Sequence, residues 1–188
     1  MANLIITIIS IALVAVAALM GAYYGGRAFL EGRIKAYATT LAQQGQQIVS
    51  AWTLYATNNG GNWALANTAA LAPTYLASVP TGPVDALYFE VTPSSWTIGD
   101  LDDVTSSTQA NFNGAYIMLA DSDVGRAVCA MIATMAAGST ATPTKLGASA
   151  TDVLTTDRKF DCAFTSYSGG PGAFPEPGDY MYVYYRAR

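Results

Sequence analysis

The stretch LIITIISIALVAVAALMGAYY, from Leu4 to Tyr24, contains no charged side chain. A helix of this length rises by about 30 Å, the thickness of the hydrocarbon core of a bilayer. Two hydroxyl groups, on Thr7 and Ser10, can bond back to carbonyl groups of the same helix. The stretch therefore predicts a membrane helix. The apolar side chains that we expect to contact the membrane are Leu4, Ile5, Ile8, Ile9, Ile11, Leu13, Val14, Val16, Leu19 and Met20.

Three interpretations of this helix compete. A cleavable signal peptide has a basic region before a shorter apolar core, whereas Met1-Ala2-Asn3 is uncharged. A conventional signal anchor has basic residues on its cytoplasmic flank, but Arg27 is the first charged residue and follows the helix. Removal of a basic leader ahead of Met1 explains both the length and the missing charge. We therefore favour a processed N-terminus at Met1.

Beyond the apolar stretch the sequence becomes amphipathic. Apolar and aromatic side chains recur with helical spacing, and no proline precedes Pro73. The cluster Asn58-Asn59-Gly60-Gly61 is a strong signal for a helix end. The pattern predicts a single helix of about 55 residues. Its expected apolar stripe consists of Leu30, Ile34, Tyr37, Leu41, Ile48, Trp52 and Tyr55.

Three glycines, Gly21, Gly25 and Gly26, lie where the two halves of this helix meet. Each one costs about 1 kcal/mol of helix stability relative to alanine. One explanation is close packing between helices, which small residues permit inside membranes. The other is a joint that unwinds locally when the helix leaves the bilayer. Both explanations stay open at this point.

The remainder of the chain has the composition of an α+β domain. We predict a helix from Val124 to Ala137, capped by Asp or Ser and closed by Gly138. An antiparallel sheet packed on the long helix would bury the apolar faces of both. The strand candidates are Leu87 to Thr92, Ser95 to Ile98, Ala115 to Leu119, Lys159 to Thr165 and Tyr180 to Tyr185. The chain thus divides into an apolar helix (1–26), an amphipathic continuation (27–57) and a head (58–188).

The two cysteines, Cys129 and Cys162, fall in the predicted helix and in a predicted strand. In an exported chain they favour a disulfide closing a loop of about 33 residues, which stabilises the fold by about 3–4 kcal/mol. The alternative is a pair of buried free thiols. A metal site would need more ligands than these two.

Composition argues against most catalytic and nucleic-acid functions. The chain has 188 residues, a net charge of −4 and no histidine, so it lacks the commonest general base and metal ligand. Nine basic residues without a long cluster do not predict direct nucleic-acid binding. Asp100, Asp102 and Asp103 form a weak calcium candidate, for which we favour a solvated turn. Lys145 and Ser149 lack the spacing of a nucleophilic pair. We expect no enzyme and no cofactor.

Taken together, these parts resemble the type IV pilins, with closest similarity to the type IVb branch. The segments AYIMLADSDVGRAVCAMIATM (115–135) and DCAF (161–164) look like the strand, the cysteine-bearing helix and the second cysteine of that branch. The resemblance implies a processed, methylated N-terminus, a prepilin peptidase and pilus assembly machinery. It also implies a helical filament of identical subunits, formed from the inner membrane, with the apolar helices as its core.

Two features depart from that family. Pilins usually have Glu at the fifth position, where this chain has Ile5, and the usual proline near the end of the membrane segment is replaced by the glycines noted above. A pseudopilin of a secretion system and a monomeric membrane-anchored binding domain are the alternative functions.

Overall fold

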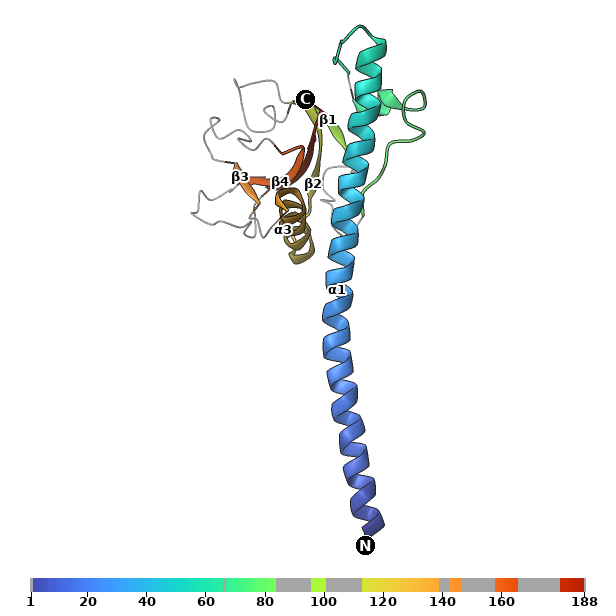
Figure 1. Ribbon diagram of the computed structural model, residues 1–188, viewed down its shortest axis with the longest axis vertical. Coiled ribbons are helices and arrows are strands. Elements are labelled where there is room, and N and C mark those ends of the chain that lie inside the picture. Colours follow the sequence, from blue (N-terminus) through green and yellow to red (C-terminus); the bar gives the residue numbers. More distant parts are fainter. Residues whose placement is uncertain are drawn as a thin grey trace.

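The computed structural model describes residues 2–65, 67–83, 96–100, 113–138, 143–146, 158–165 and 180–187. A long helix with a small α+β head beside its C-terminal half makes up this part of the chain (Figure 1). The elements in chain order are α1 (Ala2–Asn58), η1 (Thr68–Leu71), β1 (Thr97–Asp100), β2 (Asn113–Leu119), α3 (Asp123–Ala137), β3 (Thr144–Leu146), β4 (Phe160–Thr165) and β5 (Tyr180–Arg186). The α+β fold predicted from the sequence is confirmed.

Helix α1 contains 57 residues, close to the predicted length, and ends at Asn58. Gly60 and Gly61 follow with positive φ angles of 68° and 85°, which glycine adopts without the steric cost that a side chain imposes. The chain then turns back along α1. The indole nitrogen of Trp52 donates a hydrogen bond of 3.1 Å to the carbonyl oxygen of Trp63, and the two rings meet edge to face at 5.3 Å. The predicted helix end is therefore confirmed.

Within the described residues, the sheet has five strands in the order β1-β2-β5-β4-β3. Its first four strands pair antiparallel, as predicted, with Ile117 opposite Val183 and Val183 opposite Cys162. Strand β3 adds a parallel edge to β4, which the sequence did not predict. It has three residues, too few for a period of two to be recognised. The candidate strand Leu87 to Thr92 lies outside the described residues.

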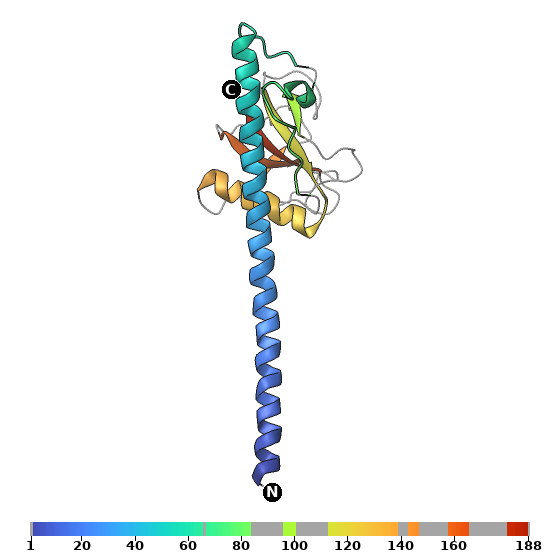
Figure 2. The same ribbon diagram turned by 90° about the vertical axis from the view of Figure 1, so that its right-hand side faces the viewer.

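One face of the sheet packs against both helices. Figure 2 shows α3 crossing α1 at a steep angle, at the end of the head nearer the N-terminus of the chain. The apolar core contains Leu41 and Ile48 of α1, Val128 and Ile132 of α3, and Val183 of β5, none more than 2% exposed. The predicted stripe on α1 thus packs against the head from Ile34 to Tyr55. Leu30, which continues the same stripe, is 50% exposed because the head does not extend that far.

Helix α3 has both of its expected caps. The Ser122 hydroxyl accepts a hydrogen bond of 3.0 Å from the backbone N–H of Gly125, which satisfies one of the free N–H groups of the first turn. Gly138 adopts a left-handed conformation with φ 67°, and its N–H bonds to the carbonyl oxygen of Thr134. The sequence predicted Asp or Ser as the N-terminal cap, and the structure has Ser122 in that position.

Helix α1 packs tightly against Trp96 and β5 at Gly45. A Cβ atom added there would lie 2.9 Å from Cη2 of Trp96 and 3.0 Å from Cβ of Tyr185. The Trp96 ring is 1% exposed, and its indole nitrogen donates to the Gln44 side chain on the preceding residue of α1. The missing side chain of Gly45 therefore lets α1 contact a buried indole ring.

Replacing this glycine by alanine is expected to lower the free energy of unfolding of the head by about 1–3 kcal/mol, the usual cost of overpacking. Urea unfolding followed by tryptophan fluorescence measures the change. Gly32→Ala is the matched control, since no atom lies within 4 Å of a Cβ added at that position of the same helix. It should be neutral or slightly stabilising. Equal destabilisation by both variants would contradict the packing argument.

Candidate functional site

The N-terminal half of α1 is the most unusual surface of the molecule. Every described side chain from residue 3 to residue 32 is exposed, including large apolar ones such as Leu4 at 68%, Leu13 at 65% and Leu19 at 71%. Soluble monomers rarely expose a continuous apolar surface of this extent. We call residues 2–32 the uncovered half of α1.

Two hydroxyl groups in the apolar stretch, those of Thr7 and Ser10, are satisfied locally. The hydroxyl of Thr7 donates to the carbonyl oxygen of Asn3 and that of Ser10 to the carbonyl oxygen of Ile6, both at 2.8 Å. These are the back-bonds predicted from the sequence. The uncharged stretch from Leu4 to Tyr24 therefore suits either a lipid bilayer or a dry bundle of helices.

By length and composition, α1 can cross a membrane. Within the described part of the chain it is the one helix that meets these criteria. The roles assigned to its apolar residues, and to Met1, which lies outside the described residues, stay predictions. The division of the chain at residue 26 also stays a prediction, since α1 is continuous there.

The three glycines between the apolar and amphipathic parts of α1 lie in a continuous helix. Gly21, Gly25 and Gly26 all lie within α1, and beyond the adjoining turns of that helix no described residue lies within 4 Å of a Cβ added at any of them. Contacts among the described residues thus do not explain why glycine stands there. Close approach by another helix and local unwinding both remain open explanations.

Charged residues begin immediately after these three glycines. Arg27, Glu31 and Lys35 are exposed, and none of them has a hydrogen bond or ion pair within the described residues. Arg33 differs, because its guanidinium group donates a hydrogen bond of 2.9 Å to the Tyr37 hydroxyl and lies 5.4 Å from the centre of that ring.

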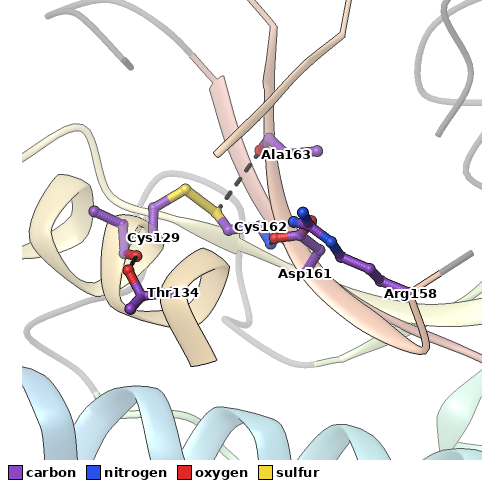
Figure 3. The surroundings of a disulfide bond; sticks show 7 residues. Cys129, Thr134, Arg158, Asp161, Cys162 and Ala163 are labelled. Atoms are coloured by element: carbon purple, nitrogen blue, oxygen red, sulfur yellow. Dashed lines mark hydrogen bonds and ion pairs between the residues drawn. A yellow bond between two sulfur atoms is a disulfide. The ribbon is translucent and has the colours of Figure 1, made fainter. Parts of the chain in front are cut away.

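The head contains the predicted disulfide between Cys129 of α3 and Cys162 of β4, at a Cα–Cα distance of 5.2 Å (Figure 3). Both residues are fully buried. The bond fastens α3 to β4, the strand between β5 and the edge strand β3. Because it is inaccessible to solvent, it serves the fold and not thiol exchange with other molecules.

An ion pair between a buried carboxylate and a partly exposed guanidinium group lies next to the disulfide and was not predicted. One carboxylate oxygen of Asp161 accepts a hydrogen bond of 2.7 Å from the Arg158 guanidinium group. The other oxygen accepts a hydrogen bond of 2.8 Å from the backbone N–H of Cys162. Figure 3 shows Asp161 between Arg158 and Cys162. The Asp161 residue is completely buried. The signal in the sequence was an acid directly before a strand cysteine with an arginine three residues earlier. That spacing alone does not tell a buried pair from a solvated one.

The remaining sequence candidates do not form a described site. Asp102, Asp103 and Ser149 lie outside the described residues, while Asp100 and Lys145 are placed only as backbone, in β1 and β3. Within the described ranges, no group of three or more metal-ligating side chains gathers. A shallow groove of about 520 Å³ lies along α1, where Gln43, Gln47 and Leu54 face Tyr75. It contains no charged side chain.

Comparisons with protein-family models, with curated proteins and with solved structures each found no match. The functional argument therefore depends on the chain's own geometry. Its central feature is the uncovered half of α1, a continuous apolar surface that leads directly into the helix on which the head is built.

Proposed function

We propose that this chain is a structural subunit of a type IV pilus-like filament. The uncovered halves of α1 from many copies bundle into the filament core, and the heads coat the outside. Before assembly, the same surface anchors each subunit in the inner membrane. The protein performs no catalysis in this function; adhesion, motility, conjugation and DNA uptake are all uses that such a filament serves.

One observation carries the proposal: the exposure of the apolar half of α1 in a chain whose head is built on the other half of the same helix. A lone anchor requires only a span and a linker. Here the membrane segment and the scaffold of the head form one rod of 57 residues. When such rods associate, each one brings its head to a defined place on the outside of the bundle.

The proposal implies further partners. A prepilin peptidase would process the N-terminus, the processed end would be methylated, and assembly machinery would extract subunits from the bilayer. Ile5 implies that the first residues associate without the carboxylate that pilins usually have at this position. A pseudopilin that forms a short periplasmic fibre is the nearest alternative in the same architecture.

Electron microscopy of material sheared from the cell surface, with antibodies raised against the head, tests the proposal. We expect long filaments decorated along their whole length. Mass spectrometry of the same material should find a processed, methylated N-terminus at Met1. Sheared material that lacks filaments containing this chain would contradict the extracellular polymer. Short periplasmic fibres would favour the pseudopilin.

A further inference from the structure

A pair of opposite charges stands on the uncovered half of α1. Arg27 and Glu31 are the only charged residues between positions 2 and 32. They are one helical turn apart and therefore lie on the same side of α1. Both are exposed, and neither has a partner among the described residues. Each charge is thus available to another molecule.

The order of the two residues favours a partner outside the helix. Within one helix, an acid four residues ahead of a base interacts better than the reverse, and this chain has the reverse order. In water the two unpaired charges are well solvated. Within a bundle of apolar helices they lose that solvation, and an unpaired charge there is strongly unfavourable. A bundle that includes this part of α1 therefore requires an opposite charge beside each of them.

A second copy of the chain supplies those charges. Two parallel α1 helices offset by about 6 Å, the rise of four residues, bring Arg27 of one copy to the level of Glu31 of the other. Gly25, Gly26 and Gly32 flank the pair and have no neighbour within 4 Å of an added Cβ. Small residues let helix backbones approach closely, which brings the two side chains within reach.

We infer that Arg27 of each subunit forms an ion pair with Glu31 of a neighbouring subunit, and that this pair sets the axial register between adjacent helices. The inference depends on the proposed filament. A charge pair at this position favours one axial register between two neighbouring helices over the others. Sliding one helix along the other separates the opposite charges or brings like charges together. The apolar surface below it provides no such selection, since hydrophobic contact is non-directional.

Charge reversal tests this inference in cells that make the full chain. Arg27→Glu and Glu31→Arg are each expected to lower the amount of sheared filament at least about tenfold, because each places like charges together. The double variant Arg27→Glu/Glu31→Arg recreates the pair in the opposite sense and should restore filaments to within about threefold of wild type. Lys35→Gln is the matched control on the same helix, and we expect normal filaments from it. The amount of each subunit in the membrane is measured in parallel.

A cross-linking experiment tests the geometry directly. Cells that express an Arg27→Cys chain together with a differently tagged Glu31→Cys chain should yield disulfide-linked heterodimers from filaments after mild oxidation. The two native cysteines are already paired with each other and do not interfere. Each variant expressed alone should give fewer dimers than the mixture.

The outcomes separate the two proposals. Absence of filaments from wild-type cells contradicts the proposed function, and this inference with it. Three results would overturn the inference and leave the proposed filament standing. They are normal filaments from both single reversals, no restoration of filaments in the double variant, and an equal loss of filaments in Lys35→Gln. Disappearance of the Arg27→Glu chain from the membrane would also overturn it and assign Arg27 to lipid headgroups.

Discussion

The substitution Leu13→Arg is expected to leave the chain in the membrane and yet to abolish the filament. Leu13 lies near the middle of the apolar stretch and is 65% exposed. The nine Leu, Ile and Val residues that remain from Leu4 to Leu19 favour membrane insertion by about 2.7–5.4 kcal/mol in total, whereas one central arginine opposes it by about 2.5–3.5 kcal/mol. Insertion therefore remains favourable or close to balanced.

In a helix bundle the same arginine has a different effect. It lies far from the solvated heads, lacks an acidic partner, and recurs in every subunit, so each added copy buries another unpaired charge at a cost of several kcal/mol. We expect filaments to fall below detection while membrane fractionation still recovers the subunit. Sheared filament and membrane-bound subunit are measured from the same cells.

Leu13→Met is the control for this position, because it preserves apolar character and approximate volume. Filaments should form normally from it. Normal filament yield from Leu13→Arg would mean that position 13 is not buried between subunits, which contradicts the proposed core. Loss of Leu13→Arg from the membrane, on the other hand, would mean that the apolar stretch inserts more weakly than the transfer values suggest.

Removing the disulfide is expected to cause the largest loss of stability in the head. Cys129 and Cys162 are 33 positions apart and both fully buried. Without the cross-link the unfolded chain regains loop entropy equivalent to about 3–4 kcal/mol, a large part of the 5–15 kcal/mol typical of a domain. The variant Cys129→Ala/Cys162→Ala avoids placing new polar groups in the core.

The measurement is urea unfolding of the full chain in detergent, followed by the fluorescence of its three tryptophans. With a slope of about 2 kcal/mol per molar urea, the midpoint should fall by roughly 1.5–2 M. Wild-type protein that is unfolded and refolded in the presence of a reductant, which reaches the buried disulfide only in the unfolded chain, should behave like the double variant. Met135→Ala, on the same helix but 37% exposed, is the matched control and should change little. An unchanged midpoint in the double variant would contradict a stabilising role.

Features that depend on nearby residues were predictable from the sequence. The helix of α1 follows from a periodic pattern and from hydrogen bonds within one segment, and its end follows from the consecutive glycines Gly60 and Gly61. The caps Ser122 and Gly138 act within a single turn of α3. Cys129 and Cys162 are the only cysteines in the chain, so their pairing had one possible connectivity. In each case the information lies in residues a few positions apart or in a count.

Other features required the tertiary structure. Trp96 reaches Gln44 across 52 positions of sequence, and nothing near Gly45 indicates that its missing side chain makes room for that ring. The pairing of β3 with β4 and the burial of Asp161 likewise depend on which segments the fold brings together.

The apolar helix with which the sequence begins shows the same division. Its length, its lack of charge and its helical state follow from the sequence alone, because a helix satisfies its backbone internally and its hydropathy is a sum over residues. The sequence did not determine where the head stops covering it. The stripe of apolar residues continues with the same period through Leu30, and only the packing of α3 and the sheet leaves Leu30 exposed while Leu41 is buried. Periodicity specifies which face of a helix is apolar; the extent of burial depends on residues far away in the chain.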